Sequence, residues 1–183
     1  MFLNGYWTGR VIDCTEDSHD MGRWSTIRLQ GSEGKKLAIV CGYRVVDTDI
    51  QTAGSSTAYS QQWTKLRTSR QEKPDPRKQY LVDLKEYIKG LKKENREVLL
   101  MMDANEETSA KEITKFLEDC DMVDLHTNQH RNLHQPPNTY IRGSKCIDMF
   151  AGTLGVAEEV ERAGIEAFYQ TLLIRTIEGF SST

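Results

Sequence analysis

The sequence lacks the features that would place a protein in a membrane or in a disulfide-stabilised secreted class. No apolar run approaches the length needed to cross a membrane. The first five residues form neither the charged n-region nor the apolar h-region of a signal peptide. The four cysteines are scattered, without a Cys-x-x-Cys pair, so reduced thiols are expected. These absences favour an intracellular protein, cytoplasmic or nuclear, without membrane contact.

The sequence also lacks an excess of basic residues, since its formal net charge is −3. This balance excludes a surface that is basic throughout, but it excludes neither a nucleic-acid partner nor an acidic metal site. With 183 residues, 38% hydrophobic and 28% charged, the chain is long enough for one domain with a real core. No internal repeat and no linker divides it. A single domain over residues 1–183 is expected.

The most informative stretch is the apolar run 98–102, which is followed at once by Asp103-Ala104-Asn105-Glu106. Five apolar residues suit a strand that is buried on both faces. In open sheets, ligands bind at the carboxyl ends of the strands. In extended geometry Asp103 and Asn105 point the same way, and a carboxylate beside an amide suits a hard cation or a phosphate. The same four residues also suit a turn followed by a helix cap.

Other segments predict an α/β chain whose central strand is surrounded by strands and helices. Alternation and β-branched residues predict strands over 6–12, 22–29, 36–45, 122–125, 146–151 and 155–161. Helices are predicted over 57–70, 76–94 and 110–120, the second because its apolar residues recur at helical spacing and the third with Thr108 or Ser109 as its cap. Loops are expected over 13–21, 47–56 and 163–170. The segment 171–183 predicts no element.

Three groups of polar residues leave alternatives open. The six basic residues between Lys65 and Lys78 fit a solvated helix face, or a contact with a phosphate backbone. His126, His130 and His134 would line one helix face as a zinc site, but Pro136-Pro137 follow and favour a loop. Asp148 lies within an apolar strand, where a lone carboxylate needs a partner or a function.

Four short motifs in order resemble a known superfamily. They are Tyr43 at the end of its strand, Met102-Asp103-Ala104-Asn105 in place of Gly-Asp-x-Asn, Thr139-Tyr140, and Lys145-x-Ile147-Asp148-Met149-Phe150 in place of Arg-Ile-Asp-Tyr. From about Gly5 to Gln170 the chain resembles the endonuclease/exonuclease/phosphatase superfamily, which includes pancreatic deoxyribonuclease and the abasic-site repair endonucleases. The nuclease-like domains of retroelements are more similar still.

The resemblance implies a partial four-layer α/β sandwich, in which two mixed sheets lie face to face with helices outside. It also implies a phosphodiesterase that depends on Mg²⁺ (or Mn²⁺) and acts on nucleic acid or another phosphodiester. Asp103 would bind the metal and align or deprotonate the attacking water, and Asn105 would hold a phosphate oxygen. Tyr43 would contact the scissile phosphate, and Asp148 would orient a histidine. We add Arg44 as a phosphate contact; its alternative is a salt-bridged surface residue.

Two parts of the family pattern are absent from the 183 residues. The metal-binding Glu and an early Asn would precede Gly5, and the closing Ser-Asp-His motif does not occur in 173–183. The segment from Ile174 can be written with synonymous codons chosen so that removal of one adenine from the codons of Arg175 and Thr176 shifts the reading frame. The shifted frame then encodes Ser-Asp-His-Arg-Gly-Leu-Phe-Ile, which contains the missing motif. This favours a frameshifted, truncated copy of a mobile-element nuclease. Loss of one transition-state donor costs about 10²–10³ in rate, so little or no activity is expected.

Two further interpretations stay open at this point. One is a non-catalytic, nucleic-acid-binding remnant of a mobile-element endonuclease that uses the basic residues between Lys65 and Lys78. The other is a product that does not fold stably, because missing first strands would leave unpaired sheet edges. The sequence does not distinguish DNA, RNA and other phosphoesters as substrates, and it does not set the oligomeric state.

Overall fold

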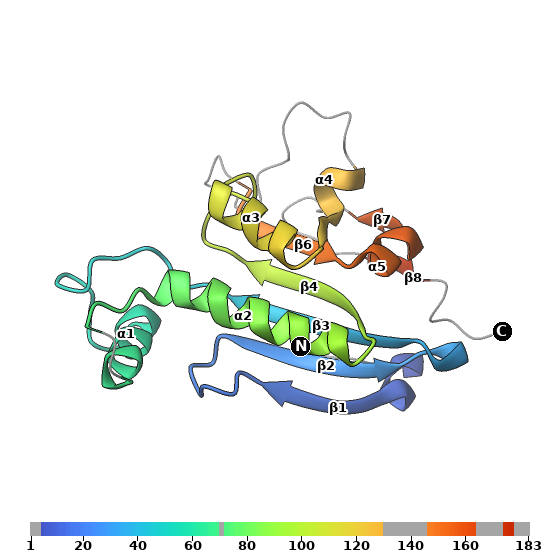
Figure 1. Ribbon diagram of the computed structural model, residues 1–183, viewed down its shortest axis with the longest axis horizontal. Coiled ribbons are helices and arrows are strands. Elements are labelled where there is room, and N and C mark those ends of the chain that lie inside the picture. Colours follow the sequence, from blue (N-terminus) through green and yellow to red (C-terminus); the bar gives the residue numbers. More distant parts are fainter. Residues whose placement is uncertain (1–4, 70–71, 130–145, 164–173, 178–183) are drawn as a thin grey trace.

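A six-stranded mixed β-sheet is the centre of the fold (Figure 1). The structure is a computed structural model that describes residues 5–69, 72–129, 146–163 and 174–177. The strands follow the order β1-β2-β3-β4-β6-β5 across the sheet. They are Val11–Glu16 (β1), Trp24–Gln30 (β2), Lys36–Tyr43 (β3), Glu97–Asp103 (β4), Val123–Asp124 (β5) and Asp148–Gly152 (β6). A separate two-stranded sheet joins Val160–Ala163 (β7) to Ile174–Ile177 (β8).

The helices connect the strands and cover the sheet. The α-helices are Ala58–Thr68 (α1), Pro76–Lys93 (α2), Lys111–Asp119 (α3), Leu125–Gln129 (α4) and Leu154–Glu159 (α5), and the 3₁₀ helices are Gly5–Arg10 (η1) and Ser32–Gly34 (η2). β1, β2 and β3 form an antiparallel meander, whereas β3 and β4 are parallel. Parallel neighbours need a long crossover, which α1 and α2 supply. β3 and β4 therefore end at the same edge of the sheet.

The start of α2 shows why the crossover helix begins where it does. The side chain of Asp75 accepts hydrogen bonds from the backbone N–H groups of Arg77 and Lys78, and Pro76 occupies the first turn. A capping carboxylate satisfies N–H groups that lack helical partners, and proline suits this position because its own N–H is missing. The predicted start of this helix at residue 76 is confirmed.

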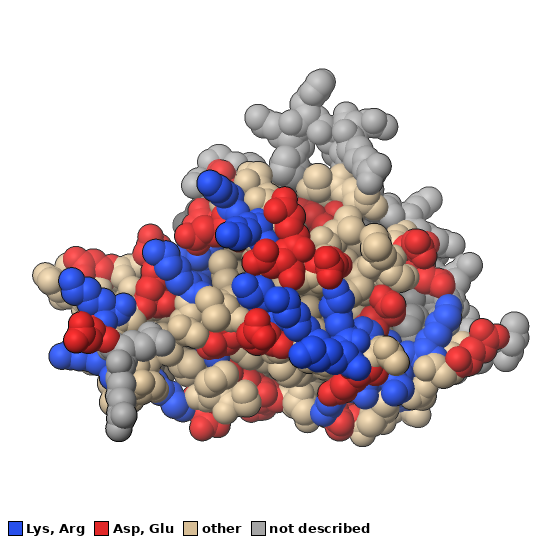
Figure 2. All heavy atoms as spheres, viewed as in Figure 1, with Lys and Arg blue, Asp and Glu red and all other residues tan. Residues whose placement is uncertain are grey.

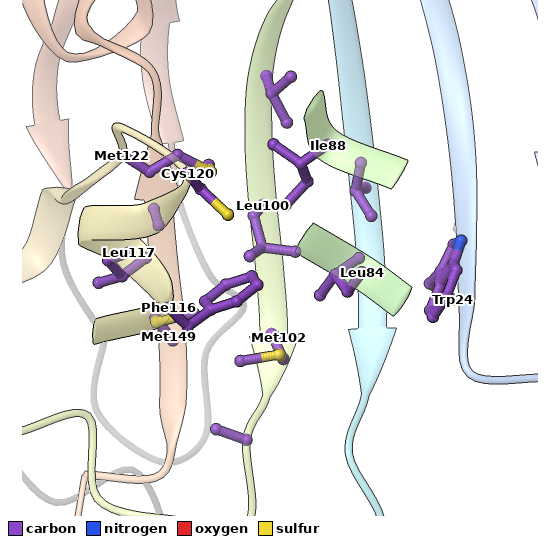
Figure 3. Packing of buried hydrophobic residues seen from close by; sticks show 14 of the residues in the cluster. Trp24, Leu84, Ile88, Leu100, Met102, Phe116, Leu117, Cys120, Met122 and Met149 are labelled. Carbon is purple, nitrogen blue, oxygen red and sulfur yellow. The ribbon is translucent and has the colours of Figure 1, made fainter. Parts of the chain in front are cut away.

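The core lies on both faces of the sheet. On one face, Leu84 of α2 and Phe116 of α3 pack with Leu100 and Met102 of β4, as Figure 3 shows. On the other face, Leu99 of β4 packs in a second cluster. Its other fully or largely buried members are Ile27, Leu29, Leu37, Leu125, Phe150, Val156 and Val160. Alternate residues of β4 thus serve opposite faces, as expected for a strand that is buried on both.

The observed fold class and most of the observed elements agree with those predicted from the sequence. The α/β class, the three-strand meander, the three long helices and the central strand are confirmed. The two-sheet sandwich is not confirmed, because the described residues hold one six-stranded sheet and the small β7–β8 sheet. No helix among them is long and apolar enough to span a membrane.

Three of the predicted segments are wrong. Most of the strand expected over 6–12 is the 3₁₀ helix η1, in which the hydroxyl of Thr8 donates to the carbonyl of Gly5 and closes a local turn. β1 begins only at Val11 and continues into the predicted loop 13–21. The strand expected over 155–161 is α5 followed by β7. Within 171–183, β8 forms where no element was expected. Short apolar runs fit either a helix or a strand, so tertiary packing decides.

Two smaller expectations are also corrected. The N-cap of α3 is Ala110, whose side chain accepts no hydrogen bond, so neither Thr108 nor Ser109 caps the helix. Asp148 is the first residue of β6 and not its middle. A carboxylate at the end of a strand avoids the cost of a charge deep in the core.

The close contact between Gly42 of β3 and Tyr80 of α2 generates a prediction. A Cβ atom at Gly42 would overlap the buried Tyr80 hydroxyl oxygen, which has no hydrogen-bond partner among the described residues. We expect Gly42→Ala to lower the free energy of unfolding by about 1–3 kcal/mol, measured by urea denaturation. Tyr80→Phe should be nearly neutral alone and should restore most of the loss in the double variant.

Tyr87→Phe is the matched control, because its hydroxyl also lies on α2 but is hydrogen-bonded to Thr15 Oγ1 at 3.0 Å. It should cost about 1 kcal/mol and should not rescue Gly42→Ala. If Tyr80→Phe costs as much as Tyr87→Phe, or fails to rescue Gly42→Ala, this description of the β3–α2 contact is incorrect.

Candidate functional site

Three of the predicted site residues lie in one row across the end of the sheet. Tyr43 of β3 pairs with Asp103 of β4, and Asp103 pairs in turn with Asp148 of β6. Residues that pair directly across neighbouring strands project to the same face, with Cβ atoms about 4.5–5.5 Å apart. We call Tyr43, Asp103 and Asp148 the sheet-end row. It lies at the carboxyl ends of β3 and β4, where open sheets place their ligands.

The two carboxylates of the sheet-end row influence each other. Asp103 is half-buried. Burial raises its pKa, the N–H of Asn105 lowers it by donating to the carboxylate, and the nearby charge of Asp148 raises it again; the net pKa lies above the ordinary value of 3.8. Two neighbouring carboxylates repel each other when both are ionised. A bound cation would offset this repulsion.

Asn105 lies next to the row, but not in the extended geometry that the sequence suggested. The strand ends at Asp103, and Asn105 adopts a left-handed conformation with φ of 46°. Its backbone N–H donates to Asp103 Oδ1 at 3.0 Å, and its Nδ2 donates to the carbonyl of Arg44 at 2.8 Å. The chain therefore turns at Asn105, as the turn alternative predicted, but these residues cap no helix, since α3 begins only at Lys111. An amide nitrogen has two hydrogens, so one stays for another acceptor.

Arg44 directly follows β3 and is buried, with 1% of the residue exposed. Its Nη2 donates to Glu112 Oε2 at 2.9 Å and its Nε to the carbonyl of Arg77 at 3.3 Å. Burial and the positive charge of Arg77 lower its pKa, against the opposing effect of Glu112. The salt bridge of the alternative interpretation is present, but Arg44 itself is buried and only Glu112 reaches the surface. The guanidinium does not face an open cleft.

Arg77 is a site-supporting residue that the sequence analysis missed. It is buried at the start of α2, where Nη1 donates to the carbonyl of Val45 at 2.6 Å. Its Nη2 donates to the carbonyl of Asn105 at 3.2 Å and to Glu106 Oε2 at 2.9 Å. One side chain thus fixes the segments after β3 and β4. The sequence placed Arg77 only within a basic stretch, and nothing in that pattern separates a buried arginine from its exposed neighbours.

Three other cations of that basic stretch have partners among the described residues. Lys65 donates to the carbonyl of Asp20, Arg67 lies 5.0 Å from the ring of Trp63, and Lys78 lies 3.6 Å from the Asp75 carboxylate. On the face that carries α2 and α3, basic and acidic side chains are interspersed (Figure 2). This arrangement matches the solvated-face interpretation.

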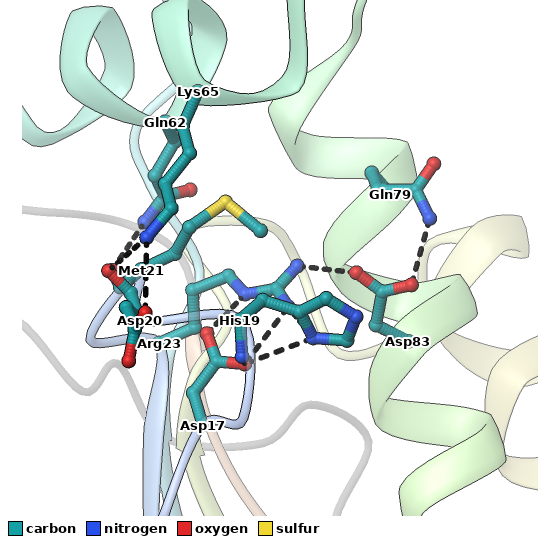
Figure 4. Close-up of polar contacts among 9 residues, drawn as sticks. All are labelled: Asp17, His19, Asp20, Met21, Arg23, Gln62, Lys65, Gln79 and Asp83. Carbon is teal, nitrogen blue, oxygen red and sulfur yellow. Dashed lines mark hydrogen bonds and ion pairs between the residues drawn. The ribbon is translucent and has the colours of Figure 1, made fainter. Parts of the chain in front are cut away.

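A cluster of charged side chains around Arg23 lies at the start of β2 (Figure 4). Arg23 holds both carboxylate oxygens of Asp17, at 2.6 and 3.0 Å, and also Asp83 of α2 at 2.6 Å. The carbonyl of Arg23 accepts the N–H of Tyr43 at 2.8 Å. Burial raises the pKa of Asp17, but hydrogen bonds from Arg23 and from the His19 N–H bring the net value below 3.8. Asp17 lies in the predicted loop 13–21, whose sequence gives no sign of this cluster.

Solved structures of low sequence identity share this architecture. The catalytic domain of human Nocturnin with bound sulfate is 12% identical in sequence, with a TM-score of 0.52. The match covers 81% of this chain and 50% of the Nocturnin chain. The 3′ phosphatase NExo from Neisseria, bound to a product DNA hairpin, is 11% identical, with a TM-score of 0.55. The match covers 85% of this chain and 63% of the NExo chain. An AP endonuclease from Archaeoglobus fulgidus is 14% identical with a TM-score of 0.53, and again matches 85% and 63%.

The chain has the endonuclease/exonuclease/phosphatase, or deoxyribonuclease I-like, fold. It spans between half and about two thirds of the length of these structures. No protein-family model and no curated protein matches the sequence. At 11–14% identity the likeness concerns the fold alone.

Asp103 and Asp148, which pair across β4 and β6, would present two neighbouring carboxylates to a cation. Mg²⁺ in proteins is commonly held by one or two carboxylates and keeps several waters. Within the described ranges no group of three or more His, Cys, Asp and Glu could hold a metal. His126 is buried in α4, whereas His130, His134, Thr139, Tyr140 and Lys145 lie outside the described residues. Among the described residues, the candidate metal site therefore consists of two carboxylates, those of Asp103 and Asp148.

The opposite pKa shifts of Asp103 and Asp17 predict opposite effects of neutralisation. A raised pKa means that Asp103 contributes stability below pH 3.8 and that this contribution is lost as pH rises through the folded-state pKa. A lowered pKa means that Asp17 contributes stability above pH 3.8, which is lost as pH falls. At pH 7, Asp103→Asn should raise the melting temperature and Asp17→Asn should lower it.

Thermal melts from pH 7 toward pH 3.5 check this, with both differences shrinking as the pH falls. If Asp103→Asn lowers the melting temperature at pH 7, or if its effect does not depend on pH, Asp103 is not the strained carboxylate described above.

Proposed function

We propose that this chain carries the metal- and phosphate-binding residues of a divalent-cation-dependent phosphodiesterase whose substrate is nucleic acid. The observation that carries the proposal is the sheet-end row, because Asp103, Asp148 and Tyr43 meet on one face at the carboxyl end of the central strands. The deoxyribonuclease I-like fold supports it, since structures of this fold include nucleases and phosphatases. NExo from Neisseria, of the same fold, is bound to a DNA hairpin product.

Each residue of the site has a role that its chemistry allows. Asp103 and Asp148 would hold Mg²⁺ or Mn²⁺, which would supply neutralisation of charge on the phosphate and a more acidic water. The Asp103 carboxylate can also accept a proton from an attacking water. Tyr43 is 42% exposed, so its hydroxyl can donate to a phosphate oxygen, and the second amide hydrogen of Asn105 can do the same. Arg44 and Arg77 position the loops and do not contact the substrate.

We further propose that the 183-residue chain hydrolyses its substrate weakly or not at all. The described residues offer two carboxylates for the metal and no cluster of three ligands. A catalytic metal held loosely leaves the phosphate imprecisely positioned, and each missing transition-state donor costs about 10²–10³ in rate.

The non-catalytic alternative, in which the chain only grips nucleic acid, has less support. It depends on the basic stretch between Lys65 and Lys78, yet Lys65 and Arg67 have local partners and Arg77 is buried. Cations that are already paired release few counterions on binding a phosphate backbone, so they add little affinity.

Metal binding is the first test. Mn²⁺ or Mg²⁺ should raise the melting temperature of the wild-type protein, because a ligand that binds only the folded state stabilises it by about 1.4 kcal/mol at ten times its Kd. Asp103→Asn should abolish this increment even though it raises the melting temperature without metal. Asp47→Asn, in an exposed loop, is the control and should keep the increment. An equal increment in Asp103→Asn would refute the site.

Hydrolysis is the second test. Supercoiled plasmid incubated with Mg²⁺ should show little or no nicking above the level of the Asp103→Ala variant, since the site lacks a third carboxylate among the described residues. Robust nicking by the wild-type chain that Asp103→Ala abolishes would confirm the residues but would contradict the proposed weakness. Robust nicking that survives Asp103→Ala would place the activity elsewhere.

A further inference from the structure

A cavity of about 590 Å³ opens beside the sheet-end row, against β1, β2 and β3. Its lining includes Glu16, Ser25, Cys41 and Tyr43. Glu16 pairs with Ser25 across β1 and β2, and Ser25 pairs with Cys41 across β2 and β3. Cys41 and Tyr43 are two residues apart in one strand and project to the same face. Trp24 and Gly42, which face α2, also line the cavity. The cavity therefore lies at the end of the sheet that carries the row, where the face of the row contributes Glu16, Ser25 and Cys41, and the two share Tyr43.

The floor of this cavity is polar, whereas the same face is apolar farther along the strands. Ile27 pairs with Ile39, and Ile39 with Leu99, in the second core cluster. One pair closer to the row, the face changes to Ser25 and Cys41. Neither these two side chains nor that of Glu16 has a hydrogen bond or ion pair in the part of the chain that the structure describes. Polar groups without protein partners are available to a ligand.

The charge of the cavity is negative. Arg23 lies in its wall, but the guanidinium is neutralised by Asp17 and Asp83. Asp20 is also in the wall, and its side chain is 90% exposed and faces Lys65 at 3.5 Å. Glu16 has no neutralising partner among the described residues. A negative cavity repels a phosphate group and favours hydrogen-bond donors.

We propose that this cavity holds one unpaired nucleobase of a nucleic-acid strand whose phosphate lies at the sheet-end row; the proposal rests on the function proposed above. Carboxylates accept hydrogen bonds from the exocyclic amino groups of bases, and Glu16 supplies the carboxylate here. The half-exposed ring of Tyr43 offers a stacking surface at the shared wall. The volume lies in the range of small-molecule sites.

Double-stranded DNA keeps its bases stacked, so the chain should prefer single-stranded or locally unpaired nucleic acid. Cytosine and adenine carry an amino group and should bind better than thymine, which offers no amino group to Glu16.

Protection of the Cys41 thiol provides a readout that does not depend on activity. Cys14 is exposed, Cys41 is partly exposed, and Cys120 and Cys146 are buried. In a Cys14→Ser background, Cys41 is then the thiol accessible to iodoacetamide. The probes are a deoxycytidine hexamer and an abasic hexamer with the same number of phosphates, both in Mg²⁺. The cytidine hexamer should bind about tenfold more tightly and slow Cys41 alkylation, because base stacking and one charge-assisted hydrogen bond are added.

Glu16→Ala should reduce the preference for the cytidine hexamer to about twofold, whereas Glu33→Ala should leave it unchanged. Glu33 is an exposed glutamate in η2, at the opposite end of the β2–β3 hairpin. Equal binding of the two hexamers overturns the proposal, and so does a preference that Glu16→Ala does not change.

Asp103→Asn separates this proposal from the proposed function. If the abasic hexamer binds in an Asp103-dependent and Mg²⁺-dependent way and the cytidine hexamer gains nothing, the metal site stands and the nucleobase site falls. If the cytidine hexamer protects Cys41 and keeps its preference, but neither Asp103→Asn nor removal of Mg²⁺ weakens the binding of either hexamer, the nucleobase site stands and the metal site falls. No binding of either hexamer overturns both.

Discussion

The parallel pairing of β3 with β4 is the constraint on which the structure depends. It places Leu37 opposite Glu97 at one end and Tyr43 opposite Asp103 at the other, so both strands end together. A shift of one residue would turn Asp103 to the opposite face, into the cluster that contains Leu100 and Met102. Because both faces of β4 are buried over most of its length, the register is specified twice. The sheet-end row is therefore a consequence of packing.

Two buried arginines stabilise the segments that continue beyond the strands. Arg77 binds the carbonyls of Val45 and Asn105, and Arg23 connects the start of β2 to α2 through Asp83. Removing one partner of a buried ion pair leaves an uncompensated charge, so these contacts are costly to break. They hold the backbone around Tyr43 and Asn105 while the side chains of the row stay accessible. The rigid support and the open face together make the region suitable for binding.

The sequence predicts much of this arrangement because its strongest signals are local. The run that ends at Asp103 identifies the central strand, and the Asp75-Pro76 pair marks the start of α2. The buried roles of Arg23, Arg44 and Arg77 could not be predicted, because each depends on a partner far along the chain: Asp83 for Arg23, Glu112 for Arg44 and the carbonyl of Val45 for Arg77. The left-handed turn at Asn105 depends on the Arg44 carbonyl in the same way. The change from strand to helix at α5 reflects packing of Val156 on the second core cluster.

Paramagnetic broadening of backbone amide signals by Mn²⁺ tests the central claim most directly. The account predicts that substoichiometric Mn²⁺ broadens the signals of Tyr43, Asp103 and Asp148 together, since the ion would lie within one row of the sheet. The signals of Lys36 and Gly152, at the opposite end of the same strands, should stay sharp. Broadening centred on another acidic surface, or broadening of Asp103 without Asp148, would contradict the account.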